Sequence, residues 1–303
     1  MLDKSFRVVS LLSSATEILY ELGGISSLVG RSHECDYPAG VHSLPCCTVP
    51  LIDIHAGSAE IDRQVKDSAR NALSIYRVFD EILEQLQPTH ILTQVQCDVC
   101  AVSLKDVEQS IASKLQSNPA IVSLNPTSLR EIWHDFHRIG NALGLDAAGA
   151  VARLQAVMPR EPASGLRVAC IEWIEPLMAA GNWTPELIEM AGAINLFGTI
   201  GEHSPWMTWE QLVDAKPDVT IVAPCGFNLA RTRSEMHWLT DRPDFPALGR
   251  VYLADGNAWF NRPGPRVVET LEILVEVLYG RTKRFEGLGW ESFSSILLVT
   301  GHV

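Results

Sequence analysis

The sequence predicts an α/β fold of two Rossmann-like lobes with parallel sheets, joined by one long backbone helix. Short β-branched runs alternate with segments of helical periodicity in both halves of the chain, which is typical of parallel sheets. Residues 88–97 (PTHILTQVQC) resemble residues 216–225 (KPDVTIVAPC). The second half therefore repeats the order of strands and helices that the first half shows. Between the halves, the helical pattern runs almost unbroken from residue 128 to about residue 158, which predicts the connecting helix.

In the first half, the opening segment RVVSLL reads as a buried strand, and Gly23-Gly24 ends the helix that follows it. The next segment, residues 31–55, is long and rich in proline, which favours a functional loop. Pro88 ends the periodic segment before the next strand. We therefore expect strands at 7–12, 28–30, 90–94 and 120–124, and helices at 15–22, 58–87 and 104–115.

In the second half, the same reasoning predicts strands at 167–171, 218–223 and 250–254, with helices at 185–193, 208–215, 232–240 and 265–279. The expected domains are an N-terminal lobe (1–127), an interlobe helix (128–160) and a C-terminal lobe (161–303). Ligands of open α/β sheets bind beyond the carboxyl ends of the strands. We therefore expect a ligand cleft between the two lobes.

The composition excludes several classes of protein. The chain has 303 residues, of which 47% are hydrophobic and 20% are charged, so it is not a disordered, coiled-coil or collagen-like chain. The formal net charge of −12 disfavours nucleic-acid and anionic-membrane partners, and we expect no nucleic-acid partner.

No run of about 18 apolar residues is present, so we expect the chain not to be embedded in a membrane. The N-terminal apolar stretch is short and no small-residue cleavage site follows it, so it does not read as a signal peptide. We therefore expect a cytoplasmic protein with reduced thiols. A periplasmic location would instead apply to a mature chain from which a leader had been removed.

The seven cysteines cannot all pair in internal disulfides, because their number is odd. The motif QCDVC follows a predicted strand and places Cys97 and Cys100 in a CxxC pair. Three interpretations stay open: a redox pair, two soft ligands for a metal or an iron–sulfur cluster, or two small residues buried in a turn.

A second thiol lies in the long loop RSHECDYP, where Cys35 stands two residues after His33. If this loop and QCDVC leave the same edge of the sheet, then Cys35, Cys97, Cys100 and His33 form a candidate metal site. We expect Cys170 and the adjacent pair Cys46-Cys47 to be structural.

The second half carries candidate residues for ligand binding and catalysis. Glu172 ends a predicted core strand and Cys225 follows another, so these two are the catalytic candidates, although the chemistry is not assigned. Aromatic residues in loops favour a flat apolar ligand surface, and His203 and Arg262 are candidate polar contacts. The candidate ligand-binding residues are Tyr37, Trp173, Trp183, His203, Trp206, Phe227, Trp259, Phe260 and Arg262.

The sequence carries no GxGxxG, GxxxxGK[ST], GxSxG or HExxH motif. Dinucleotide-binding, NTPase, serine-hydrolase and zincin activities are therefore disfavoured, but enzymes in general are not excluded.

Five segments carry a resemblance to a known family: RVVSLLSSATEILYELGG, LVGRSHECDYP, QCDVCAVS, IEWIEPLMAAGNWTPEL and FNRPGPRVVETLEIL. They resemble the cobalamin-binding, BtuF-like substrate-binding proteins, which are helical-backbone metal receptors with the class III periplasmic-binding-protein fold. The resemblance covers roughly residues 7–278. The opening strand and helix are shared by the whole superfamily and indicate fold more than ligand. The segments more specific to a subgroup labelled cobalamin-binding are HECDYP, QCDVCAVS and EWIEPLMAAGNW.

The resemblance implies a binding protein for cobalamin, another corrinoid or a related metal-containing cofactor, associated with the permease of an ABC transporter. Two features of the sequence depart from the pattern of this family. No export signal is seen, and binding a corrinoid does not require the thiols at positions 35, 97, 100 and 225. Both favour a cytosolic subgroup. The alternatives are an intracellular metalloprotein or enzyme with a metal or iron–sulfur cluster on Cys35, Cys97 and Cys100, and a thiol redox protein that uses Cys97 and Cys100.

Overall fold

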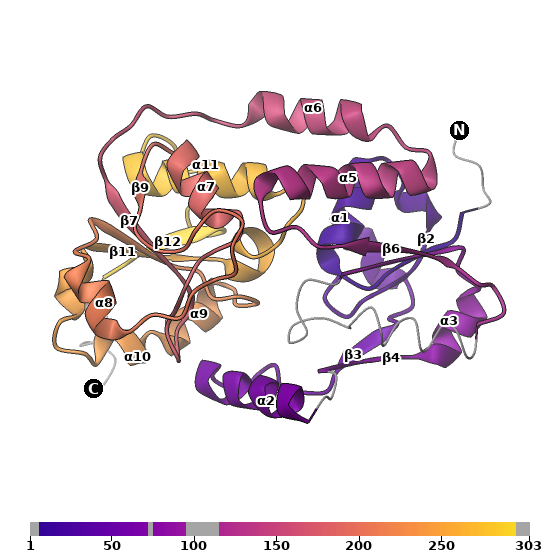
Figure 1. Ribbon diagram of the computed structural model, residues 1–303, viewed down its shortest axis with the longest axis horizontal. Helices are drawn as coiled ribbons and strands as arrows, with labels where there is room; N and C mark the ends of the chain where they lie inside the picture. The colour runs from indigo at the N-terminus through magenta and orange to yellow at the C-terminus, as the bar shows by residue number, and fades with distance from the viewer. Residues whose placement is uncertain (1–5, 72–74, 95–114, 295–303) are drawn as a thin grey trace. The chain divides into compact units, whose positions relative to one another are not determined.

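The computed structural model describes residues 6–71, 75–94 and 115–294 (Figure 1). The chain forms two compact units. The first comprises residues 1–56, 60–156 and 263–265, and the second comprises residues 57–59, 157–262 and 266–303. Within the described ranges, no helix is both long enough and apolar enough to cross a membrane.

The first unit is built on a four-stranded parallel sheet with the strand order β2-β1-β5-β6. Its strands are β-branched and apolar, and Val8, Val9, Ile91 and Leu92 are fully buried, as expected for a sheet covered on both faces. The predicted parallel α/β architecture is confirmed. The strands are β1 (Val8–Ser10), β2 (Leu28–Arg31), β5 (His90–Gln94) and β6 (Ala120–Leu124).

Helix α1 (Ser13–Glu21) follows β1, and the chain leaves it through Gly23 at φ 74°. The single helix expected at residues 58–87 is wrong. The structure has α2 (Ser58–Arg70), strand β4 (Tyr76–Val78) and α3 (Asp80–Leu86), and β4 pairs antiparallel with β3 (Thr48–Pro50). The apolar residues of β4 fit a helix face and a strand equally well, so periodicity alone could not separate the two.

The prediction of one long connecting helix is also wrong. The structure has two helices, α5 (Leu129–Leu143) and α6 (Ala147–Val157), seen as separate helices in Figure 1. Gly144 adopts the left-handed conformation at φ 67°, and the Leu145 N–H donates to the Gly140 carbonyl, which ends α5. Asp146 then begins α6, because its Oδ1 accepts the Gly149 N–H at 2.9 Å.

The second unit contains a mixed sheet with the order β12-β11-β10-β7-β8, and β9 also pairs with β7. The strands β7, β10, β11 and β9 are parallel, whereas β8 and β12 pair antiparallel with their neighbours. The strands are β7 (Arg167–Trp173), β8 (Met178–Ala179), β9 (Ile194–Asn195), β10 (Val219–Val222), β11 (Arg250–Ala254) and β12 (Trp290–Phe293).

Local sequence explains where the helices of this unit begin. Pro185 occupies the first turn of α7, a capping box of Thr208 and Gln211 starts α8, and the Asn228 side chain caps α9. In place of the single helix expected at 232–240, the structure has two short helices. Of the helix expected at 104–115, residues 104–114 lie outside the described ranges. The helices are α7 (Thr184–Met190), α8 (Trp209–Asp214), α9 (Leu229–Glu235), α10 (His237–Thr240) and α11 (Val267–Tyr279).

Four short helical turns complete the described elements. Three are 3-10 turns and the fourth, η4, is a π-helical turn whose N-terminus is capped by Asp255. They are η1 (Ile25–Ser27), η2 (Ala39–Ser43), η3 (Phe245–Leu248) and η4 (Gly256–Phe260).

Candidate functional site

In the first unit, the loop of residues 32–45 returns to the carboxyl end of β2, where it began. The Arg31 N–H donates to the Pro45 carbonyl at 3.0 Å, and the Cys47 N–H donates to the Arg31 carbonyl at 2.7 Å. The long loop that the sequence marked as functional is therefore closed at its base. Its first residues lie at the edge where ligands of parallel sheets bind.

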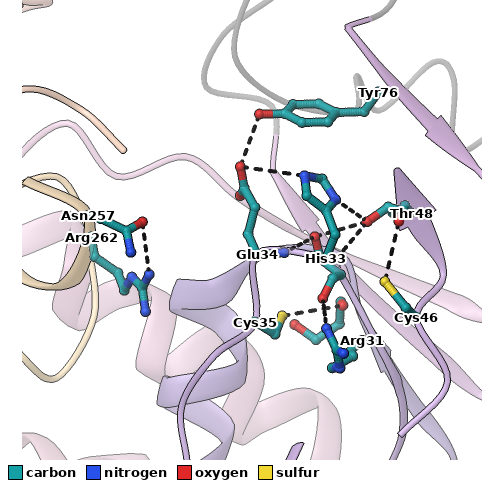
Figure 2. A network of polar contacts seen from close by, with 11 residues as sticks. Arg31, His33, Glu34, Cys35, Cys46, Thr48, Tyr76, Asn257 and Arg262 are labelled. Carbon is teal, nitrogen blue, oxygen red and sulfur yellow. Dashed lines mark hydrogen bonds and ion pairs between the residues drawn. The ribbon is translucent and has the colours of Figure 1, made fainter. Parts of the chain in front are cut away.

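His33 is fixed in this loop by one hydroxyl group. The Thr48 Oγ1 accepts the backbone N–H of His33 at 3.0 Å and lies 2.7 Å from the imidazole Nδ1 (Figure 2). The same Oγ1 donates to the Ser32 Oγ at 3.0 Å. Thr48 belongs to β3, so this strand positions the imidazole.

Figure 2 shows that Glu34 and Tyr76 complete a polar cluster around His33. The Tyr76 hydroxyl donates to Glu34 Oε1 at 3.0 Å, and the rings of His33 and Tyr76 have centroids 5.2 Å apart. The same Oε1 lies 4.0 Å from His33 Nε2. Burial lowers the pKa of His33, and the nearby Arg31 also lowers it, while Glu34 opposes them. The imidazole is therefore neutral at neutral pH.

Cys35 packs as a buried thiol. It is 1% exposed, its Sγ lies 3.1 Å from the Thr16 Oγ1 of α1, and it lies 4.0 Å from the Ser10 carbonyl oxygen. Burial raises the pKa of the Cys47 thiol to about 12, in keeping with a structural role.

The candidate metal site is only partly within the described ranges. Cys97 and Cys100 lie outside them. Among the residues that are described, no group of three or more His, Cys, Asp and Glu side chains could hold a metal ion. The site of Cys35, His33, Cys97 and Cys100 therefore stays a prediction.

Tyr37 lies at the exposed part of the same loop. It is 42% exposed, and its ring packs edge-on against Tyr20 of α1 at a centroid distance of 5.6 Å. The role of Tyr37 in ligand binding stays a prediction.

In the second unit, Glu172 lies near the carboxyl end of β7. Its Oε1 accepts the Ser204 hydroxyl at 2.9 Å, and the Ser204 Oγ in turn accepts the backbone N–H of Gly181 at 3.1 Å. Burial raises the pKa of Glu172, while the Ser204 hydroxyl, the Gly181 N–H and His203 oppose the rise. The Cys225 N–H donates to the Glu172 carbonyl at 3.0 Å, so the two catalytic candidates lie on adjacent strand ends.

Cys225 occupies an exposed turn. The Phe227 N–H donates to the Pro224 carbonyl at 3.0 Å, and Gly226 supplies the φ of 75° that the turn requires. The carboxyl end of β10 therefore presents a thiol beside an aromatic residue.

Aromatic residues gather at this end of the sheet. Trp173 and Phe227 have ring centroids 5.3 Å apart, and the Arg231 guanidinium stacks over Phe227 at 3.8 Å. Trp173 pairs with Met178, and Met178 forms a bridge with Trp206, which places Trp206 in the same row across the sheet. Trp206 is 54% exposed and Trp173 is half-buried, whereas Phe227 is 1% exposed, so Trp206 and part of Trp173 face solvent.

The other predicted ligand residues differ in exposure. Trp183 and Phe260 are buried, and the Trp183 indole donates to the Phe260 carbonyl at 3.2 Å. Trp259 is half-buried and donates to Glu269. Arg262 is buried and its Nη2 donates to Asn257 Oδ1 at 3.4 Å, whereas His203 is exposed. Their roles in binding stay predictions.

Sequence reasoning missed the residues that orient these side chains. Thr48 and Tyr76 orient His33 and Glu34, and Ser204 holds Glu172. Sequence reasoning also missed Arg231, whose guanidinium stacks over Phe227. Its position four residues after Phe227 could have indicated this contact. No local signal marked Tyr76, because its region was interpreted as a helix.

Solved structures with this fold cover nearly the whole chain. A periplasmic heme-binding protein from Pseudomonas aeruginosa matches at a TM-score of 0.63 with 18% identity, over 95% of this chain and 98% of its own. The periplasmic vitamin B12-binding protein BtuF of Vibrio cholerae matches at a TM-score of 0.56 with 19% identity, over 90% and 96%.

An ABC transporter substrate-binding protein from Listeria monocytogenes matches at a TM-score of 0.62 with 16% identity, over 91% of this chain and 99% of its own. No protein-family model and no curated protein matches the sequence. The chain has the class III substrate-binding fold that the resemblance implied.

The expected cytoplasmic location is contradicted by these neighbours. Several of the solved proteins that share the fold are periplasmic, including those from Pseudomonas aeruginosa and Vibrio cholerae. The short apolar stretch near the N-terminus was therefore a poor guide to location. The assignment of this chain to a cytosolic subgroup rested mainly on the expected cytoplasmic location, so this correction removes its main support.

Proposed function

We propose that this protein is a periplasmic substrate-binding protein that delivers a tetrapyrrole-type metal chelate to the permease of an ABC transporter. Neighbours in fold are described as binding heme or vitamin B12, and one is described as an ABC transporter substrate-binding protein. Both ligands are large, flat macrocycles around a metal ion. Within this class we propose cobalamin or another corrinoid as the ligand.

The aromatic row of the second unit is the observation that carries the proposal. Trp173 and Phe227 pack at 5.3 Å near the carboxyl ends of β7 and β10, and Trp206 adds an exposed indole. Aromatic faces bind flat apolar rings through a large contact area, at a low cost in side-chain entropy. Ligands of α/β sheets bind at this end.

The polar groups beside this row suit a ligand that also carries polar substituents. Glu172 can accept or donate a hydrogen bond, depending on its protonation, and the Arg231 guanidinium lies against Phe227. Ligand sites commonly combine apolar walls with a few fixed polar groups of this kind. The combination supports a macrocycle with a polar periphery.

Calorimetric and absorbance titrations with cyanocobalamin and with hemin test the proposal. Trp206→Ala removes an exposed aromatic wall, so we expect it to weaken binding by about tenfold or more without affecting folding. Trp238→Ala is the matched control, because Trp238 is also exposed (38%) but lies on α10. Absence of binding of both macrocycles at micromolar protein would overturn the proposal.

A further inference from the structure

The first unit contains two hydrogen-bond acceptors that lie side by side in the loop after β2. We infer that His33 Nε2 and the Glu34 carboxylate form an acceptor pair that selects a macrocycle bearing primary carboxamides over one bearing carboxylates. This inference rests on the proposed function and specifies its ligand. It is carried by the hydrogen bonds around Thr48 and Tyr76 (Figure 2).

The tautomer of His33 follows from the bonds of Thr48. The Thr48 hydroxyl has one proton, and it donates this proton to Ser32 Oγ. Toward His33 it can therefore only accept, so the imidazole carries its proton on Nδ1 and donates it to Thr48 Oγ1 across 2.7 Å. The other ring nitrogen, Nε2, is left with an unshared electron pair.

This Nε2 has an unmet hydrogen-bonding capacity. It is buried, and among the described residues it has no hydrogen-bond partner. A buried acceptor without a donor is costly, which favours a state in which a donor reaches it.

The second acceptor is held in place by Tyr76. The Tyr76 hydroxyl donates to Glu34 Oε1, which keeps this oxygen 4.0 Å from His33 Nε2. A single –NH₂ nitrogen can lie at about 2.9 Å from two acceptors with this separation and give one hydrogen to each. The Glu34 side chain is 46% exposed and that of His33 is 18% exposed, so solvent reaches the pair from the Glu34 side.

The pair discriminates between amide and acid. A primary carboxamide offers two N–H donors, whereas an ionised carboxylate offers acceptors only and repels the Glu34 charge. Corrin rings carry primary carboxamide side chains, and haem carries carboxylates. A protein that uses this pair would therefore favour a corrinoid over haem.

The test measures the affinities of wild-type protein and of two variants for cyanocobalamin, for cobalamin monocarboxylates made by partial amide hydrolysis, and for hemin. We expect wild type to prefer cyanocobalamin over the monocarboxylates by about tenfold or more, on the basis of one charged hydrogen bond. Glu34→Gln offers a donor to a carboxylate and still accepts from Tyr76, so we expect it to lose most of this preference. His33→Asn keeps a donor for Thr48 and deletes Nε2, so we expect it to weaken cyanocobalamin binding.

Matched controls separate the pair from general effects of charge. Glu81→Gln removes an exposed acid from α3 of the same unit, and His42→Asn changes an exposed histidine in the same loop. We expect both to behave as wild type. Unchanged preference in Glu34→Gln, or tighter binding of hemin than of cyanocobalamin, would overturn the inference and leave a macrocycle-binding protein. Absence of all macrocycle binding would overturn the proposed function with it.

Discussion

The hydroxyl of Ser204 donates a 2.9 Å hydrogen bond to Glu172 Oε1 and accepts the backbone N–H of Gly181 at 3.1 Å. One side chain thus joins the loop before α8 to the carboxyl end of β7 and to the segment after β8. Because burial raises the pKa of Glu172, its carboxyl depends on this donor whenever it is ionised. Ser204 is therefore a structural support for the second unit at the end of the sheet where we propose that ligand binds.

Removing this hydroxyl should destabilise the protein. Ser204→Ala leaves both the Glu172 oxygen and the Gly181 N–H without their partner, so we expect the free energy of unfolding to fall by about 1–3 kcal/mol. Urea denaturation at pH 7 measures the change. Ser234→Ala is the control, because this exposed hydroxyl donates only to the Arg231 carbonyl in its own helix. Equal losses in the two variants would contradict the role given to Ser204.

Asp135 should make the stability of the first unit depend on pH. It is fully buried in α5, its Oδ1 accepts from Arg138 at 2.7 Å, and its Oδ2 has no hydrogen-bond partner among the described residues. Burial raises its pKa to about 7, against the opposing Arg138 charge. The folded state thus prefers the protonated acid. Its contribution to stability is complete below the unfolded pKa near 4 and is lost as the pH rises through 7.

We expect Asp135→Asn to remove this dependence. The variant should resemble wild type near pH 4.5 and should be more stable at pH 8, by an amount on the order of 1–3 kcal/mol, because no charge is buried. Melting temperatures between pH 4.5 and 8.5 measure the difference. Asp146→Asn, at the exposed start of α6, is the control and should leave the pH profile of wild type unchanged. A variant that loses stability at pH 8 would show that the ionised carboxylate is needed.

Three of the strands could be predicted from sequence with accuracy. The bounds of β5, β6 and β11 match the predicted ranges, because each is a short, largely apolar run bounded by turn-forming residues. The antiparallel pair of β3 and β4 could not be predicted in the same way. Its second strand forms through pairing with distant residues, and its own pattern fits a helix as well.

In the candidate site, too, some features could be predicted from local sequence and others could not. The loop after β2 was identified from its length and prolines, and Glu172 from its place at a strand end. The orientation of His33 depends on Thr48, and that of Glu34 depends on Tyr76, so both require the pairing of β3 with β4. A sequence can thus indicate which residues carry chemistry, whereas the partners that set their protonation and geometry come from tertiary pairing.

The break between α5 and α6 depends on the left-handed conformation of Gly144. A Cβ at this position meets no atom within 4 Å, so the cost of Gly144→Ala is conformational only. We expect a loss of about 1–2 kcal/mol, and a smaller loss for Gly144→Asn, because asparagine tolerates φ values near 67°. Chemical denaturation of the two variants measures the difference. Stabilisation by alanine would instead indicate a continuous helix in solution.

Glu276 should be the acid-sensitive group of the second unit. It is 2% exposed in α11, its Oε2 accepts the Trp290 indole N–H at 2.8 Å and the Phe285 N–H at 3.0 Å, and its Oε1 accepts the Arg284 N–H at 2.8 Å. Burial opposes ionisation, but these donors together lower the pKa of Glu276. Its contribution is therefore present above the unfolded pKa and is lost as the pH falls through the lower, folded one.

Glu276→Gln tests this arrangement, because the amide –NH₂ would face the two donors on Oε2. We expect a loss on the order of 2–4 kcal/mol at pH 7, and a smaller change in stability between pH 6 and pH 3 than in wild type. Glu272→Gln is the matched control on the same helix. Its carboxylate makes a surface ion pair with Arg284, so its loss should stay below about 1 kcal/mol. If both variants lost the same stability, the buried hydrogen bonds of Glu276 would contribute no more than a surface charge.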